Sequence, residues 1–339
     1  MTPGRATAEG TARFRQRFAD RTAAGHFRSA AGLWLSSIGV GTYLGALDAA
    51  TDAAYEEAIL AALAAGINVF DSAANYRGGH SERCIGRALE QAFANGLAAR
   101  DEVFVSTKGG FPADGGPHSL EPSFLEGELE KSRASLGLET IDLYYLHNPE
   151  TALSSGSTDE ALESVRRALA WGGGARDEGR VAAVGIATWG GLRQPPGAAD
   201  HLPLTELVGP DPESPALVAV QLPLNLAMPE ALAAPTQELD EATLPALVVA
   251  RYAGLWTFAS ASILQGRLTA GLPAEIAEIF PGLGTDAQRA LQFTRSAPGV
   301  TTALVGMSSP EHVRENLELV RHEPAAAEEL QRLFAGGVS

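Results

Sequence analysis

The sequence has 339 residues, of which 45% are hydrophobic and 19% charged. This composition is typical of a soluble globular protein, and the length suits one large domain such as a (β/α)8 barrel, which commonly reaches about 250 residues or more. The formal net charge of −16 argues against nucleic-acid and anionic-membrane partners, because both present phosphate groups that would repel the chain.

Cys84 is the only cysteine, so neither an internal disulfide nor a cysteine metal cage is expected. It lies in a helical pattern and is interpreted as a buried structural thiol. The scattered histidines predict no metal site. No apolar run reaches the roughly 18 residues of a membrane span and no secretory signal is visible, so we expect a cytoplasmic protein.

The first thirty or so residues are rich in arginine: Arg5, Arg13, Arg15, Arg17, Arg21 and Arg28. Such a bias suits either a targeting peptide or a flexible or helical arm, and we favour the arm. The following segments GHFRSA and GLWLSS predict a small hairpin that closes the bottom of a barrel. We therefore divide the chain into an N-terminal arm and hairpin over 1–32 and a single barrel domain over 33–339.

From residue 33 onward, short β-rich runs alternate with longer helical patterns, as in repeated βα units. Most of the β-rich runs are near-continuously apolar, which is typical of strands covered on both faces. The eight runs are SIGVGTY, INVFD, VFVSTK, IDLYYLH, VAAVGIAT, LVAVQLP, GLWTFAS and TALVGM.

The intervening segments carry apolar residues at three- and four-residue intervals, and several begin at Ser, Thr or Asp and stop at Gly. The helical candidates are TDAAYEEAILAALAAG, SERCIGRALEQAFANG, EPSFLEGELEKSRASLG, STDEALESVRRALAWGG, ELDEATLPALVVARYAG, DAQRALQFTRSA and PEHVRENLEL. The Pro- and Gly-rich stretch after the fifth strand replaces most of one helix. The pattern predicts a closed (β/α)8 TIM barrel, with an open doubly wound sheet as the alternative.

Four ionisable residues fall at corresponding places in this pattern. Asp71, Lys108 and His147 each end a predicted strand, and Tyr76 follows the second strand. Singly, they could be a helix cap, a solvated charge, a core histidine and a packing aromatic. Because the carboxyl ends of all barrel strands face one mouth, we expect them to meet at an active site.

These residues fit proton-coupled hydride transfer. Reducing a carbonyl builds negative charge on its oxygen, which requires a nearby donor able to give up its proton. A free tyrosine has a pKa of about 10. We expect the Lys108 ammonium to lower the pKa of Tyr76, Asp71 to orient the lysine, and His147 to act as a second donor.

The segments FDSAANY, GHSERCIGRAL, VFVSTKGG and IDLYYLHNP resemble the catalytic core of the aldo-keto reductase superfamily. The resemblance implies that Asp71, Tyr76, Lys108 and His147 form its catalytic tetrad. It also implies an oxidoreductase that uses NADP(H) or NAD(H) to interconvert an aldehyde or ketone and an alcohol. Glu82 and Gly86 match an element that is expected to shape the barrel.

The cofactor side departs from the family's pattern. Thr188 stands in GIATW where the family usually has Ser-Asn, Gln221 matches the carboxamide-binding glutamine, and Ser260 replaces a stacking tyrosine, for which Trp189 or Trp256 could substitute. The resemblance places the adenosine end on the last βα unit, with Gly306, Met307, Ser308, His312, Glu315 and Asn316.

Gly306 and His312 occupy positions where many NADPH-preferring members carry a lysine and an arginine. Losing these two cations weakens recognition of a 2′-phosphate, so the preference between NADH and NADPH stays open. Arg314 either compensates or is solvated.

The loops at the mouth offer Tyr43, Asn148, Trp189, Arg193 and Asn225 as substrate-binding candidates, a mixture that suits a hydroxylated or sugar-like molecule. The sequence does not indicate the oligomeric state. Two other functions stay open on the same barrel: a cofactor-binding regulatory or scaffold protein, and a non-redox lyase or isomerase.

Overall fold

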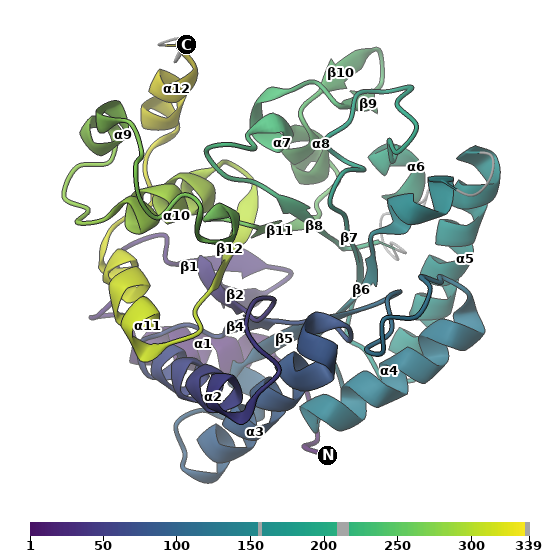
Figure 1. Cartoon of the computed structure of the whole chain (residues 1–339), viewed down its shortest axis with the longest axis horizontal. Helices are drawn as coiled ribbons and strands as arrows, with labels where there is room; N and C mark the ends of the chain where they lie inside the picture. Colours follow the sequence, from purple (N-terminus) through teal and green to yellow (C-terminus); the bar gives the residue numbers. More distant parts are fainter. Residues whose placement is uncertain (155–157, 209–216, 336–339) are drawn as a thin grey trace.

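A computed structural model describes residues 1–154, 158–208 and 217–335 and shows a closed parallel barrel (Figure 1). The strands pair in the order β11-β12-β3-β4-β5-β6-β7-β8. Their bounds are β3 Ile38–Gly41, β4 Val69–Asp71, β5 Phe104–Gly109, β6 Leu143–His147, β7 Val184–Ala187, β8 Ala219–Pro223, β11 Trp256–Ser260 and β12 Val300–Gly306. All eight predicted strands are therefore confirmed, and the open-sheet alternative is wrong.

Helices surround the strands in Figure 1. Those that follow the barrel strands include α2 Ala49–Ala64, α3 His80–Ala94, α4 Pro122–Leu136, α5 Thr158–Asp177, α8 Ala246–Tyr252, α10 Asp286–Ser296 and α11 Pro310–Leu317. Shorter or terminal helices are α1 Ala8–Arg17, α6 Leu204–Val208, α7 Glu230–Ala233, α9 Ala274–Ile279 and α12 Ala327–Ala335. The 3₁₀ turns are η1 Tyr76–Gly79, η2 Arg100–Glu102, η3 Pro149–Ser154, η4 Leu264–Gly266 and η5 Glu318–Arg321.

One helical prediction is half wrong. The segment ELDEATLPALVVARYAG begins with an antiparallel hairpin, β9 Gln237–Leu239 and β10 Ala242–Leu244, and only then continues as α8. Pro245 caps α8 because its fixed φ and missing N–H suit a helix start better than a helix interior. The Pro- and Gly-rich stretch after β7 contains the short α6, and its part over 209–216 lies outside the described residues.

The N-terminal hairpin pairs β1 Phe27–Ala30 with β2 Leu33–Ser36. Its residues Ala30 and Leu35 are buried among side chains from the barrel interior, including Phe104 and Phe258. The hairpin therefore fills the bottom of the barrel, as predicted, and the boundary that we propose between residues 32 and 33 falls in its turn.

The arginine-rich arm forms α1, whose Thr7 side chain caps the Gly10 amide at 3.0 Å. Phe14 of α1 is fully buried, and Arg13 pairs with Asp101 at 2.8 Å. The arm is therefore a packed helix. Among the described residues, no helix is long and apolar enough to cross a membrane.

Candidate active site

Strand ends bring the four predicted catalytic residues to one mouth of the barrel. Asp71 ends β4, Lys108 lies one residue before the end of β5, and His147 ends β6. Tyr76 begins η1, the turn that leads from β4 to α3. This grouping follows from parallel strands in register, because Asp71 pairs beside Ser106 on β5.

Asp71 and Lys108 form a buried ion pair, with Lys108 Nζ 2.6 Å from Asp71 Oδ2. The lysine also donates to the Ser72 carbonyl at 2.6 Å. The other oxygen of Asp71 accepts from Ser106 Oγ at 2.7 Å and from Gln221 Nε2 at 2.9 Å. Burial lowers the pKa of Lys108, while the Asp71 carboxylate opposes this effect. Ser106 and Gln221 thus hold the Asp71 carboxylate, which in turn binds the lysine.

Tyr76 lies next to this pair, with Lys108 Nζ 4.8 Å from the centre of its ring. Its ring centre is 5.9 Å from that of His147, and the two rings meet edge to face. Burial raises the pKa of the Tyr76 phenol well above 10, and Asp71 and Tyr43 raise it further. The pKa of Tyr76 is therefore raised and not lowered as we expected, because burial of the phenol is the largest influence on it.

His147 is buried, and its Nδ1 has no hydrogen-bond partner among the described residues. Burial lowers the pKa of His147 well below 6.5, and the Lys108 and His118 charges act in the same direction. The imidazole is therefore neutral at pH 7 and carries one N–H donor. The Phe111 ring packs edge to face against it, with ring centres 5.3 Å apart.

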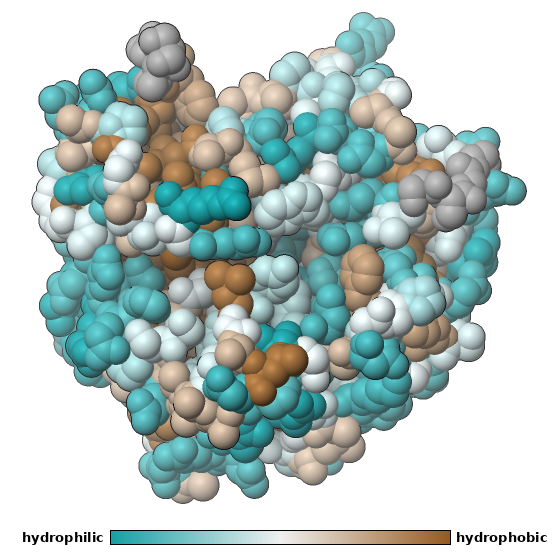
Figure 2. Space-filling view, viewed as in Figure 1, coloured by the Kyte–Doolittle hydropathy of each residue, from teal (hydrophilic) through white to brown (hydrophobic). Residues whose placement is uncertain are grey.

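A cavity of about 900 Å³ opens at this mouth, where Figure 2 shows a hollow near the centre of the molecule. Asp71, Tyr76 and His147 line it, while Lys108 lies behind them. Most of the predicted cofactor and substrate residues also line the cavity: Tyr43, Asn148, Thr188, Trp189, Gln221, Ser260, Gly306, Ser308, His312, Glu315 and Asn316.

Three predicted binding residues do not line the cavity. Met307 is fully buried in the hydrophobic core, because alternate residues at the end of β12 point away from the barrel interior. Arg193 pairs with Glu230 at 2.7 Å. Asn225 is buried and donates to the Ala261 carbonyl at 3.0 Å, so its amide holds a loop. The structure contradicts these three side-chain assignments.

The two tryptophans proposed for stacking differ in position. Trp256 begins β11 and lies at the bottom of the barrel, where it packs 6.2 Å from Phe104 and lines a small pocket with Arg28. It cannot reach the mouth, so this alternative is wrong. Trp189 lines the cavity, and Glu150 Oε1 accepts its backbone N–H at 2.8 Å.

The predicted adenosine end is the loop between β12 and α11. Ser309 caps α11 by accepting the His312 amide at 3.3 Å. Asn316 Oδ1 is buried at the cavity wall without a partner among the described residues, which leaves one acceptor for a ligand N–H. An adenine amino group fits this acceptor.

No lysine or arginine is among the described residues that line the cavity. Arg314 is 68% exposed and pairs with Glu311 at 2.6 Å, so it is solvated. Glu315, in contrast, lines the cavity and accepts from Thr285 Oγ1 at 2.6 Å. This end of the site is therefore neutral to acidic.

Several lining residues were missed from the sequence. Phe111 lies two residues beyond β5, and its position after the strand that carries Lys108 could have indicated it. Gln265 and Gly266 lie in η4, where Gln265 has a φ of 55°. A left-handed non-glycine residue in a loop has no signal in composition or periodicity.

Glu82 and Gly86 have the structural role that was expected. Buried Glu82 accepts from Thr107 Oγ1 at 2.6 Å, which joins α3 to β5. A Cβ at Gly86 would lie 2.7 Å from the Ser135 carbonyl oxygen, so α3 and α4 approach closely there. Cys84 is buried in α3, as predicted. Among the described residues, no cluster of side chains could hold a metal ion.

The barrel carries an Asp, Tyr, Lys and His set at its mouth, and comparison with known proteins shows which family this chain resembles. Residues 37–198, which include all four side chains, match the Aldo/keto reductase family model. The resemblance to the aldo-keto reductases that the motifs carry is thereby confirmed.

Individual relatives agree. An aldo-keto reductase from Mycolicibacterium paratuberculosis is 34% identical over 139 residues, a stretch covering 41% of each chain. The aldo-keto reductase YhdN from Bacillus subtilis is 26% identical over 250 residues, covering 72% of this chain and 63% of that one. The matches thus span less than two thirds of these relatives' length.

Solved structures share the fold across nearly the whole chain. An aldo/keto reductase from Klebsiella pneumoniae, crystallised with NADP and acetate, superposes with a TM-score of 0.68 at 21% identity. The alignment covers 92% of this chain and 95% of that one. This chain therefore shares the (β/α)8 barrel fold of that structure.

Proposed function

We propose that the chain is an NAD(P)H-dependent oxidoreductase that interconverts a carbonyl and an alcohol, with Tyr76 as the general acid and base. One observation carries the proposal: the Tyr76 phenol lines the cavity beside neutral His147 and the buried Lys108–Asp71 pair. A hydrogen-bond donor with its own proton is what a developing alkoxide requires.

A nicotinamide cofactor, when bound, supplies the hydride that the side chains of this site cannot supply. The raised pKa of Tyr76 keeps its hydroxyl protonated at neutral pH, so the residue can donate to a carbonyl oxygen. The neutral imidazole of His147 offers a second N–H that would orient the same oxygen. Lys108 holds a positive charge over the Tyr76 ring and favours negative charge nearby.

The residues that would hold the cofactor lie along the wall of the cavity. Thr188, Gln221 and Ser260 would surround the nicotinamide, although Gln221 already donates one N–H to Asp71. Glu315 and Asn316 would lie at the adenosine end. The cavity of about 900 Å³ is large enough for both a dinucleotide and a small carbonyl substrate.

The test is the variant Tyr76→Phe, which removes only the hydroxyl. We expect reduced-nicotinamide turnover with a panel of aldehydes, ketones and sugars to fall about 10²- to 10⁴-fold, because general acid catalysis contributes that much. Cofactor dissociation constants from fluorescence titration should stay unchanged. Tyr252→Phe is the matched control, because that side chain is 73% exposed on α8.

Equal turnover by the wild type and Tyr76→Phe across the panel would contradict the redox proposal. Cofactor binding without any turnover would instead indicate a regulatory or scaffold protein on the same barrel.

A further inference from the structure

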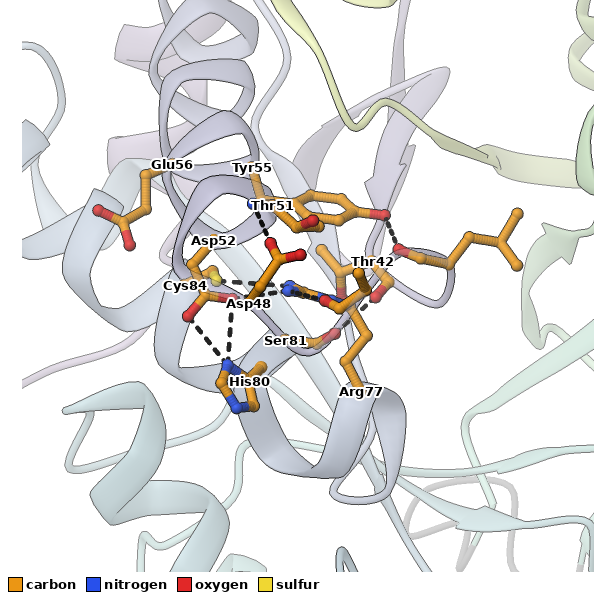
Figure 3. A network of polar contacts seen from close by, with 12 residues as sticks. Thr42, Asp48, Thr51, Asp52, Tyr55, Glu56, Arg77, His80, Ser81 and Cys84 are labelled. Atoms are coloured by element: carbon orange, nitrogen blue, oxygen red, sulfur yellow. Dashed lines mark hydrogen bonds and ion pairs between the residues drawn. The ribbon is translucent and has the colours of Figure 1, made fainter.

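We propose that Arg77 is a positioning residue that fixes the loop over residues 42–46 against Tyr76 and thereby shapes the substrate side of the cavity. The proposal rests on the function proposed above. Arg77 follows Tyr76 directly, yet it does not line the cavity, and its side chain is only 1% exposed and lies within the polar network of Figure 3.

The backbone after Tyr76 is turned so that Arg77 can point in this direction. Arg77 and Gly78 have φ values of 51° and 58°, and Gly79 has a φ of 80°. A left-handed conformation is costly for a residue with a side chain, so the contacts of Arg77 must stabilise it.

The Arg77 guanidinium has three strong contacts. Its Nε and Nη2 donate to the Ala46 carbonyl at 3.0 and 2.6 Å, and Nη2 also pairs with Asp52 Oδ1 at 2.6 Å. Asp52 lies on α2, while Ala46 lies in the loop that joins β3 to α2. Arg77 therefore joins the turn that carries Tyr76 to both that loop and the helix behind it.

Two further side chains hold the same loop in the same way. Tyr55 donates its hydroxyl to the Leu44 carbonyl at 2.6 Å, and Ser81 donates to the Thr42 carbonyl at 2.6 Å. The carbonyls of alternate residues, Thr42, Leu44 and Ala46, thus accept from α3, from α2 and from η1. The donors Ser81, Tyr55 and Arg77 are labelled in Figure 3. Arg77 also lies 5.2 Å from the centre of the Tyr55 ring.

Tyr43 lies between the first two of these anchors. Its ring centre is 5.0 Å from that of Tyr76, edge to face, and the residue is 53% exposed at the cavity mouth. Leu44 of this loop and Leu47, which follows it directly, are 44% and 65% exposed. Figure 2 shows brown, hydrophobic residues close to the central hollow. A fixed loop therefore places the aromatic ring of Tyr43 against the ring of Tyr76 at the cavity mouth.

Asp52 remains a stable anion in this arrangement. Although burial raises its pKa, hydrogen bonds from His80 and Arg77 lower the pKa to about 2. Asp52 also contacts Arg87 at 3.3 Å. Removing Arg77 therefore leaves Asp52 with two partners, whereas the Ala46 carbonyl loses both of its donors.

The experiment compares Arg77→Met with Arg87→Met in the full chain. Both variants remove one arginine partner of Asp52, but among the described residues the other contacts of Arg87 are with Glu56 at 2.6 Å and Cys84 Sγ at 3.7 Å, and neither lies in the loop. Arg77→Lys is the conservative variant, because it keeps a charge for Asp52 while losing the two-pronged contact with Ala46. Each variant is measured for hydrogen exchange of amides 42–48, for NADH dissociation constant and for kcat and KM.

We expect exchange over 42–48 to rise in Arg77→Met and less in Arg77→Lys, with wild-type exchange in Arg87→Met. Because misplacement by about 1 Å can cost about 100-fold in rate, kcat/KM for the carbonyl should fall at least about tenfold in Arg77→Met. The dissociation constant of NADH should stay within about twofold, since cofactor binding is expected on other walls of the cavity.

Unchanged loop exchange in Arg77→Met would overturn the proposal, as would equal kinetic losses in the Arg77 and Arg87 variants. Faster loop exchange with unaltered kcat and KM would reduce Arg77 to a purely structural role and would overturn it as well. A wild-type chain without turnover would contradict the proposed function, and the exchange comparison would then still decide whether Arg77 fixes the loop.

Discussion

At neutral pH Tyr76 keeps its proton because burial, Asp71 and Tyr43 all raise the pKa of its phenol. His147 stays neutral because burial, Lys108 and His118 lower the pKa of its imidazole. The two donors at the mouth therefore carry protons without carrying charge. This suits reduction, in which negative charge appears only as the reaction proceeds.

The pH dependence of the reaction rate follows from the raised pKa of Tyr76 and the lowered pKa of His147. Reduction requires protonated Tyr76, so kcat should stay level from about pH 6.5 to about pH 10 and fall only above the raised tyrosine pKa. Alcohol oxidation requires the phenolate and should rise throughout the same range. Steady-state rates in both directions, with the cofactor saturating, measure this.

The expected profile has no inflection for His147 near its ordinary pKa of about 6.5, because that pKa is lowered. A loss of reduction centred near that pH would contradict a neutral His147. A plateau of the oxidation rate near neutral pH would contradict Tyr76 as the titrating base.

The sequence allowed us to predict where four site residues lie, because the carboxyl ends of all strands in a parallel barrel lie at the same end. These residues are Asp71, Tyr76, Lys108 and His147. The direction in which the pKa of Tyr76 shifts could not be predicted, because it depends on how deeply the folded chain buries the phenol and on the nearness of Asp71 and Tyr43. The position of the Arg193 side chain could not be predicted either, because its partner Glu230 is 37 positions away in the sequence.

At the scale of elements, α11 and the loop before it would determine whether the site prefers a dinucleotide with or without a ribose 2′-phosphate. A 2′-phosphate is best held by a lysine or arginine. The described lining residues include neither, and Glu315 adds a carboxylate. The neutral end suits an unphosphorylated ribose at least as well as a phosphorylated one.

We therefore expect the dissociation constant of NADPH to be no lower than that of NADH at low ionic strength. The variant Gly306→Lys should tighten NADPH selectively, because it adds a cation at a lining position where a Cβ has open space. Fluorescence titration measures both constants. Strong NADPH selectivity in the wild type would contradict this account of α11.

Element boundaries were predictable wherever turns and periodicity agreed, as in α3 and α4. The β9–β10 hairpin was not, because ELDEATL reads as a helix start by composition while its register pairs Leu239 with Ala242. Asp240, in the turn between them, has a φ of 54°, a conformation that aspartate adopts more readily than most residues. Local sequence alone does not distinguish a helix from a strand in this segment, and the packing of the folded chain favours the strand.

At the scale of the whole molecule, α1 belongs to the fold and is not an appendage. Phe14 packs against Phe18 and Phe27, with ring centres 4.8 and 6.1 Å away. Arg17 pairs with buried Glu102 at 2.7 Å, which joins the arm to η2 beneath the barrel. Two of the arginines in this segment, Arg13 and Arg17, therefore form ion pairs with the chain around η2, while Arg15 and Arg21 lie over the Trp34 and Phe18 rings.

We expect Phe14→Ala to lower the free energy of unfolding by about 3–5 kcal/mol, the usual cost of truncating a buried phenylalanine. The control Arg13→Ala should leave the free energy of unfolding nearly unchanged, because its pair with Asp101 is solvent-exposed. Urea denaturation measures both. Equal, small effects would mean that α1 is not part of the cooperative unit.

The β1–β2 hairpin and the cavity lie at opposite ends of the barrel, so substitutions at the two ends affect different properties. Ala30 and Leu35 fill one end with apolar side chains, so substitutions there act on stability, while the loops around Tyr43 and Trp189 at the other end border the cavity. Changes at such distant sites add almost independently. Substitutions in the loops at the mouth can therefore change the shape of the cavity with little effect on the stability of the barrel.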